Sequence, residues 1–212
     1  PLPVAVNTSG VLSGKTLVSV SAGRGFACAL DSAGIPYCWG RNNSGQLGDG
    51  SASGGLSRVP VAVTAAGALA STTLTQISSG NEHTCVLDDT VYCWGANASG
   101  QLGDGSTLPK DVPVTVSMAS IPGGRASAIG VGWDSSCALS ATGSAYCWGN
   151  NDVGQLGNGT WGAVNNASTP TAVSTAGVLG GRTLEGISIN RRSACAWDDS
   201  AYCWGNNGNG QL

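Results

Sequence analysis

The tetrapeptide Tyr37-Cys38-Trp39-Gly40 decides the fold, because it occurs three more times at almost equal spacing. The further copies begin at Tyr92, Tyr146 and Tyr202, and their tryptophans follow one another at intervals of 55, 54 and 56 residues. A period this regular indicates one supersecondary unit repeated four times. A unit of this size is too small to hold a core alone, so neighbouring units must pack together. We expect a single array over residues 1–212, with repeats at approximately 1–58, 59–111, 112–168 and 169–212.

Composition favours an all-β protein and excludes two classes of function. The 34 glycines, together with short runs rich in Val, Thr and Trp, are typical of strands joined by tight turns. The net charge is −3 and Arg191-Arg192 is the one adjacent basic pair, so the chain lacks the clustered Lys and Arg that nucleic-acid binding needs. No apolar run approaches the roughly 18 residues of a membrane helix. We therefore expect neither nucleic-acid binding nor membrane insertion.

Eight cysteines fall two to a repeat, and their spacing predicts how they pair. The two members lie 10, 8, 10 and 8 residues apart, on either side of turn sequences such as Asp31-Ser32-Ala33-Gly34. In an antiparallel hairpin, a change of two residues keeps both cysteines opposed, whereas a change of one moves a cysteine to the other face. Directly opposed residues lie within disulfide range. The predicted bridges are Cys28–Cys38, Cys85–Cys93, Cys137–Cys147 and Cys195–Cys203.

Buried free thiols and a zinc site are the alternatives to disulfides. Free thiols do not explain why the loop changes length in steps of two. Zinc is disfavoured because the spacing lacks Cys-x-x-Cys and the chain has a single histidine, His83. Four disulfides require an oxidising compartment, so the predicted location is secreted or at a cell surface. We expect no metal and no cofactor.

Each repeat carries four short strand-like segments, which is the content of one propeller blade. A segment that begins with proline comes first, at residues 3–6, 60–63, 113–116 and 170–173. A second segment follows at residues 17–21, 74–78, 126–131 and 184–189, and the cysteine hairpin supplies the other two. The sequence therefore predicts an all-β fold, a β-propeller of four-stranded antiparallel blades, with four blades present.

The hairpin and the loop after it resemble the repeat of the regulator of chromosome condensation family. The resemblance rests on Trp-Gly-x-Asn-x-x-Gly-Gln-Leu-Gly at residues 39–48, 94–103 and 148–157, with a shorter fourth copy at 204–212. The family implies a propeller of usually seven blades, so we expect a partial propeller, closed by further repeats of the parent chain or by another subunit. The paired cysteines, and the loss of the family's usual histidine except at His83, resemble an extracellular bacterial branch.

Candidate binding residues are those that vary in an otherwise uniform repeat. They stand just before the first cysteine of a pair, or in an insertion in the case of Trp161; the set is Arg24, Glu82, Trp133, Asp134, Trp161, Arg191 and Arg192. Trp and Arg are enriched at the centres of protein interfaces. Because equivalent loops of successive blades gather at one rim, we expect Arg24, Glu82, Trp133, Asp134, Arg191 and Arg192 to form one mixed aromatic and charged surface.

The predicted function is a non-enzymatic extracellular or cell-surface module that binds a protein or glycan partner or serves a structural role. No cluster of acid, base and nucleophile breaks the repeat, so we name no catalytic residues. A secreted enzyme inhibitor is the alternative, since a propeller-type β-lactamase inhibitory protein belongs to the same repeat family. His83 beside Glu82 fits a structural position, and the aspartate pairs at 88–89 and 198–199 fit turns. Glycosylation stays open at the five sequons, Asn7, Asn42, Asn97, Asn158 and Asn166.

Overall fold

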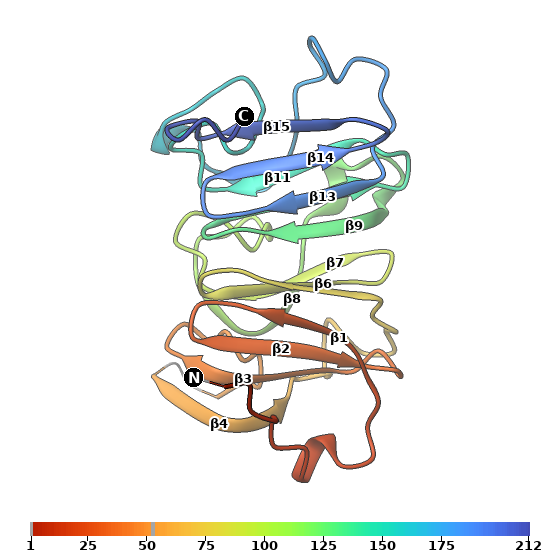
Figure 1. Cartoon of the computed structure of the whole chain (residues 1–212), viewed down its shortest axis with the longest axis vertical. Helices are drawn as coiled ribbons and strands as arrows, with labels where there is room; N and C mark the ends of the chain where they lie inside the picture. Colours follow the sequence, from red (N-terminus) through yellow and green to blue (C-terminus); the bar gives the residue numbers. More distant parts are fainter. Residues whose placement is uncertain (1, 52–53) are drawn as a thin grey trace.

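The computed structural model describes residues 2–51 and 54–212, which form four antiparallel sheets that follow one another along the molecule (Figure 1). We call them blades 1 to 4; within the described ranges, the first three have four strands and the last has three. Short 3-10 helices lie in the connections, at η1 (Gly10–Leu12), η2 (Met118–Ser120), η3 (Pro122–Gly124) and η4 (Ala163–Asn165). The strands are β1 (Leu17–Ala22), β2 (Phe26–Asp31), β3 (Pro36–Asn42), β4 (Gly55–Ala62), β5 (Gln76–Ser79), β6 (His83–Leu87), β7 (Val91–Gly95), β8 (Lys110–Thr115), β9 (Ala126–Val131), β10 (Ser135–Ser140), β11 (Ala145–Gly149), β12 (Ala167–Ala172), β13 (Gly186–Ile189), β14 (Ser193–Trp197) and β15 (Ala201–Gly205).

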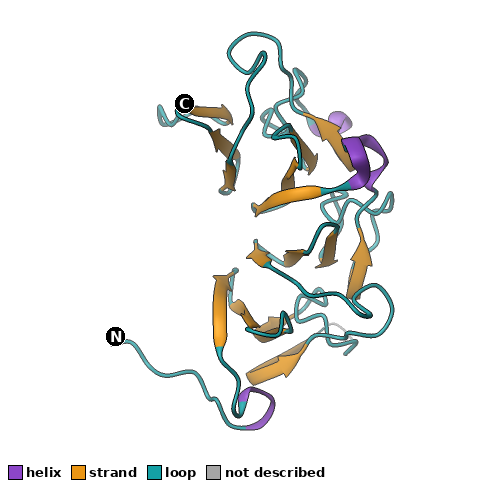
Figure 2. Ribbon diagram, turned by 90° about the vertical axis from the view of Figure 1, so that its right-hand side faces the viewer, coloured by secondary structure: helices purple, strands orange, loops and turns teal. Residues whose placement is uncertain are grey.

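The blades form part of a propeller. The first strand of each blade contacts the first strand of the next, so that β1, β5, β9 and β13 converge on one side. Figure 2 shows the blades following an arc that is open on one side, with both chain ends on that side. The prediction of an all-β partial propeller is confirmed. No helix in the described residues is long and apolar enough to cross a membrane.

The four predicted disulfides are present with the predicted register. Cys28 faces Cys38 across β2 and β3, and Leu30 faces Pro36. The shorter hairpin keeps the same relation, because Cys85 faces Cys93 and Val86 faces Tyr92. Bridges 137–147 and 195–203 close the other two hairpins in the same way. All eight cysteines are therefore bonded within their own blade.

The prediction that the proline segments form the first strand of each unit is wrong. Residues 60–62 lie in β4, which pairs with β3 of the preceding hairpin, with Tyr37 opposite Ala62 and Cys38 opposite Val61. The segments at 113–115 and 170–172 close blades 2 and 3 in the same way. Each of these segments forms backbone hydrogen bonds with the second strand of the cysteine hairpin before it. Residues 3–6 have no such hairpin before them in the described chain and form no strand. The predicted repeat limits therefore describe the period of the sequence rather than the limits of the sheets.

The motif loop joins one blade to the next. The indole of Trp94 donates a hydrogen bond to the Gln46 carbonyl oxygen at 3.0 Å, and Trp148 does the same to Gln101 at 2.9 Å. Both tryptophans have 0% exposure. Each rests on a glycine of the preceding loop: a Cβ atom at Gly103 would lie 2.7 Å from Nε1 of Trp148. This close approach explains why the motif requires glycine there.

The motif asparagines hold the loop in shape. The side-chain oxygen of Asn42 accepts a hydrogen bond from the Leu47 backbone N–H at 3.0 Å, and Asn97 accepts from Leu102 at 2.9 Å. Asn42 and Asn97 are 2% and 1% exposed, so these two sequon amides are buried and already bonded. The asparagine side chain thus supplies the hydrogen-bond acceptor that this buried backbone N–H group needs.

Candidate functional site

Three of the predicted binding residues meet where the first strands of the blades end. Trp133 follows β9, and the guanidinium carbon of Arg191, which follows β13, lies 3.6 Å from the centre of its ring. Arg24, which follows β1, lies 5.7 Å from the same ring centre. One indole therefore holds two guanidinium groups that are far apart in sequence. We call these three residues the Trp133 surface.

The Trp133 surface borders a shallow hollow of about 320 Å³. Backbone glycines form its floor because the blades approach closely there: a Cβ atom at Gly132 would lie 2.4 Å from the Asn190 carbonyl oxygen. Gly23 and Gly80 stand at the equivalent places in blades 1 and 2. The sequence-based prediction missed these residues. An alignment of the four repeats could have found them. The position directly before Arg24, Asn81, Trp133 and Arg191 is glycine in three repeats (Gly23, Gly80 and Gly132) and asparagine in the fourth (Asn190).

The electrostatics of the Trp133 surface favour an anionic ligand. None of the salt bridges among the described residues involves Arg24 or Arg191, and both side chains are exposed. Stacking on the indole uses the flat face of a guanidinium and leaves its N–H donors at the edge free. Such donors form paired hydrogen bonds with carboxylate or phosphate oxygens. The arrangement can therefore bind an anion beside the indole.

Glu82 lies at the contact between blades 1 and 2, where it already has partners. Its Oε2 accepts a hydrogen bond from the Ser44 hydroxyl at 2.9 Å, and its Oε1 lies 4.0 Å from Arg41 Nη1. Glu82 also lines a hollow of about 300 Å³ whose other residues belong to the loops of blades 1 and 2. This carboxylate therefore joins blades 1 and 2.

Asp134 and Arg192 stand beside the Trp133 surface. Burial raises the pKa of Asp134 above its ordinary value, while Asn81 and Arg192 act in the opposite direction and Glu82 adds to the rise. Arg192 is exposed and lines a polar hollow of about 560 Å³ with Asn206 and Gln211. Both groups can set the charge around the indole.

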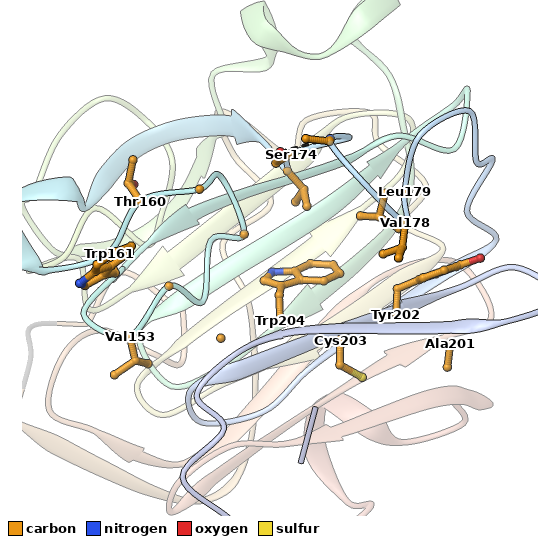
Figure 3. A pocket seen from close by; sticks show the side chains of 16 residues that line it. Val153, Thr160, Trp161, Ser174, Val178, Leu179, Ala201, Tyr202, Cys203 and Trp204 are labelled. Carbon is orange, nitrogen blue, oxygen red and sulfur yellow. Dashed lines mark hydrogen bonds between the residues drawn. The ribbon is translucent and has the colours of Figure 1, made fainter. Parts of the chain in front are cut away.

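Trp161 lies apart from the Trp133 surface. Its side chain is 73% exposed and lines a different hollow, together with Trp204 and Tyr202 of blade 4 (Figure 3). The structure therefore separates the seven residues into the Trp133 surface, its charged neighbours, Glu82 at a blade contact, and Trp161.

His83 and Ser136 form a buried pair that has the composition of a catalytic dyad. The two side chains are hydrogen-bonded and each has 0% exposure. A general base must reach its substrate, and no substrate reaches this pair in the folded protein. The pair belongs to the packing between blades 2 and 3. In the described part of the chain, no three or more His, Cys, Asp or Glu side chains are grouped so as to hold a metal ion.

Comparison with family models identifies three repeats in the chain. The model described as "Regulator of chromosome condensation (RCC1) repeat" matches residues 34–87, 88–139 and 142–181. A second model of the same description matches residues 17–46, 74–101 and 126–155. The three matches of the first model together cover well over half of the chain.

Curated relatives and solved structures agree with the family models. The chain is 31% identical to human E3 ubiquitin-protein ligase HERC2 over 95% of its own length but 4% of HERC2. It is 31% identical to the ultraviolet-B receptor UVR8 of Arabidopsis thaliana over 75% of its length and 34% of the receptor. The fold is similar to human WBSCR16 (TM-score 0.77, 21% identity, 89% of this chain and 47% of that one). It is also similar to Prp20p of Saccharomyces cerevisiae (TM-score 0.75, 21% identity, 92% and 45%). The chain thus spans less than half of each of these proteins.

Proposed function

Because the chain belongs to the regulator of chromosome condensation (RCC1) repeat family, we propose that it is a protein-binding module whose contact surface is the Trp133 surface. The observation that carries this proposal is the stack of Arg191 on Trp133 at 3.6 Å, with Arg24 on the same ring. Residues from blades 1, 3 and 4 meet there on a rigid floor of glycine backbone. A preorganised aromatic group flanked by arginines is the composition of an interface centre.

The partner that fits this surface is a protein segment rich in carboxylates. Two arginines without ion-pair partners in the described residues offer donors for Asp or Glu side chains. The net charge of the whole chain is −3, so long-range attraction does not bring an acidic partner in. Recognition then depends on contact at short range, where the two arginines can donate hydrogen bonds to the partner directly. Prp20p, a structural relative, is described as binding Gsp1p and histones, which supports protein binding as the role of such a propeller.

The rest of the proposed function concerns location and chemistry. Four disulfides support an extracellular or cell-surface site, because bridges persist in oxidising compartments. We propose that the chain acts without catalysis of its own. Inhibition of a secreted enzyme is a special case of the same proposal, in which the partner is the enzyme and the Trp133 surface contacts it.

The experiment titrates the 212-residue chain into fluorescein-labelled hexaglutamate and follows fluorescence anisotropy. Labelled hexalysine is the charge-reversed probe. The proposal expects binding to hexaglutamate, and about tenfold weaker binding for Trp133→Ala and for Arg191→Ala, the size of a hot-spot loss. Melting temperatures should stay close to that of the unchanged chain, because Arg191 is exposed and half-buried Trp133 belongs to none of the cores between blades.

Arg58→Ala is the matched control, because Arg58 is an exposed arginine on the outer strand β4. It should leave hexaglutamate binding unchanged. Equal losses in Arg58→Ala and Arg191→Ala would show a non-specific charge effect. Absence of hexaglutamate binding would refute the acidic partner.

A further inference from the structure

A second hollow lies between the motif loops of blades 1 and 2, and it shares no residue with the Trp133 surface. Its volume is about 300 Å³, and its walls include Asn43 and Ser44 of blade 1 and Glu82, Ala96, Ala98 and Pro109 of blade 2. All of its lining residues lie between positions 43 and 109. The hollow is therefore formed by two adjoining four-stranded blades and does not depend on either end of the sequence. We call it the Glu82 pocket.

Two alanines keep the Glu82 pocket open. Ala96 and Ala98 occupy motif positions that carry larger polar side chains in the neighbouring repeats, Arg41 and Asn43 in blade 1 and Asn150 and Asp152 in blade 3. In blade 3 these two side chains bond each other, because Nδ2 of Asn150 donates to Oδ2 of Asp152 at 3.1 Å. In blade 2 the same positions offer methyl groups, which leave room above the loop.

Glu82 supplies the charge of the pocket, and one of its oxygens has spare capacity to accept hydrogen bonds. Oε2 accepts from the Ser44 hydroxyl at 2.9 Å, whereas Oε1 has Arg41 Nη1 at 4.0 Å, beyond hydrogen-bond length. None of the other salt bridges among the described residues involves Glu82. The side chain is 27% exposed, so water screens it less than it screens a fully exposed carboxylate.

The charges around the pocket favour a cation. Burial raises the pKa of Asp134, and the carboxylate of Glu82 adds to this rise, so the two carboxylates lie close enough to interact. Asp152 and Arg192 also act on Asp134, and Arg41 faces Glu82. The group thus contains three carboxylates and two guanidinium groups. One further positive charge would balance it.

The shape of the pocket fits a lysine side chain better than an arginine. A guanidinium binds a carboxylate best through two parallel hydrogen bonds, which need both oxygens, and Ser44 already uses Oε2. A lysine ammonium is a point charge that can bind Oε1 alone. Its methylene stem can pack on Ala96, Ala98 and Pro109 while the charged end meets Glu82.

We propose that the Glu82 pocket binds a lysine side chain of the protein partner, with the ammonium group on Oε1 of Glu82. The pocket adjoins the Trp133 surface, because Asp134 directly follows Trp133 in the sequence and interacts with Glu82. The inference deepens the proposed function and rests on it for the identity of the partner. A segment with carboxylates for the two arginines and a lysine for Glu82 would fit both sites, whereas a purely acidic segment would fit one.

The test is an NMR titration of the ¹⁵N-labelled 212-residue chain with Nα-acetyl-lysine amide, which carries one ammonium group and no carboxylate. The proposal expects saturable shifts of the Ala96 and Ala98 amide signals. Nα,Nε-diacetyl-lysine amide, which lacks the charge, should not produce them. Nα-acetyl-arginine amide should bind more weakly than the lysine probe, because one oxygen of Glu82 is already occupied.

Three variants separate binding from a structural role of Glu82. Glu82→Gln keeps an oxygen for Ser44 but removes the charge, and it should weaken lysine binding about fivefold or more. Ala98→Leu should weaken it similarly, because the exposed position tolerates leucine while the pocket is filled. Arg41→Ala removes the cation that competes for Oε1 and should strengthen binding about twofold. If the contact of Glu82 with Arg41 were only structural, Arg41→Ala would not strengthen binding.

Glu185→Gln is the matched control, because Glu185 is the other glutamate of the chain and is exposed. It should leave lysine binding unchanged, and melting temperatures check that every variant is folded. Absence of saturable shifts, equal shifts with the diacetylated probe, or equal weakening by Glu185→Gln and Glu82→Gln would overturn the proposal. Failure of this titration while hexaglutamate still binds would overturn the Glu82 pocket alone, and the proposed function would stand.

Discussion

Nε2 of His83 lies 2.9 Å from Oγ of Ser136, across the contact between blades 2 and 3. The Ser136 hydroxyl donates to the carbonyl oxygen of Gln101 at 2.9 Å, and the same oxygen accepts from the indole of Trp148. Because Ser136 directs its proton to Gln101, His83 must donate from Nε2. Burial lowers the pKa of His83 to about 3, so the ring is neutral in the folded protein at neutral pH.

The first prediction is a loss of stability on mild acidification that depends on His83. An unfolded histidine takes up a proton near pH 6.5, whereas the folded protein holds His83 neutral down to about pH 3. The contribution of neutral His83 is therefore complete above pH 6.5 and is lost as the pH falls, at up to about 1.4 kcal/mol per pH unit. Denaturant unfolding between pH 6.5 and about 5, above the ordinary pKa values of carboxyl groups, should show this slope, and His83→Gln should remove the part that belongs to His83.

His83 is the only histidine in the sequence, so its ring signals can be followed by NMR without assignment. They should stay constant from neutral pH down to about pH 4, well below the ordinary histidine pKa. Titration of these signals near pH 6.5 in the folded protein would contradict the buried neutral ring.

The second prediction concerns the glycine on which a motif tryptophan rests. Gly103 and Gly123 have nearly the same backbone angle, φ +71° and +72°, but a Cβ atom at Gly103 would meet Trp148 and one at Gly123 would meet nothing within 4 Å. Both alanine variants suffer the left-handed backbone cost of about 1–2 kcal/mol. Gly103→Ala should lose at least about 1 kcal/mol more, because the indole must move. Equal losses in the free energy of unfolding would show that the contact with Trp148 does not matter.

The third prediction compares two tryptophans of the repeated motif. Trp148 is 0% exposed and bonded to Gln101, whereas Trp39 is half-buried because no described blade precedes it. Trp148→Ala should lower the free energy of unfolding by about 3–5 kcal/mol, the usual loss for a large buried side chain. Trp39→Ala should cost clearly less. Chemical unfolding of both variants measures the difference, and a larger loss for Trp39→Ala would refute the blade-to-blade role of the motif.

The fourth prediction is an order of reduction among the disulfides. Cys203 is exposed, whereas Cys93 and Cys147 have 0% exposure. A reductant must reach a sulfur atom, so in the 212-residue chain the bridge 195–203 should be reduced first. Timed alkylation and peptide mapping under mild reduction gives the order. Prior reduction of 85–93 or 137–147 would contradict this difference in burial.

The hairpins are predictable from the sequence because their information is local. A cysteine separation that changes only by two fixes which residues oppose each other, and this spacing alone places Cys28 opposite Cys38 and Val86 opposite Tyr92, as the sheets confirm. The motif tryptophans likewise recur at a period that requires packing between units.

The strand order could not be predicted in the same way. In a repeated sequence, a Pro-x-x-Val segment stands after one hairpin and before the next, and its pattern is the same in either role. Pairing of Val61 with Cys38 is decided by the free edge of β3, a three-dimensional feature that the period does not contain.

The candidate site was predicted in part. Comparing the variable positions of the repeats identified Arg24, Trp133 and Arg191. It did not show that both arginines lie over the same indole, because that contact depends on the angle between successive blades. Glu82 was grouped with them, yet its carboxylate contacts Ser44 and Arg41 of blade 1. A comparison of equivalent positions in the repeats does not show contacts between residues of different repeats.

The most direct test of the binding surface is a titration of hexaglutamate followed by the indole N–H signals in a ¹H–¹⁵N NMR spectrum. The chain has seven tryptophans, assigned by single replacement. We predict that the Trp133 signal shifts on binding, while exposed Trp161 and buried Trp94 and Trp148 stay unchanged. Shifts of Trp161 without Trp133, or equal shifts of both, would contradict a binding surface centred on Trp133.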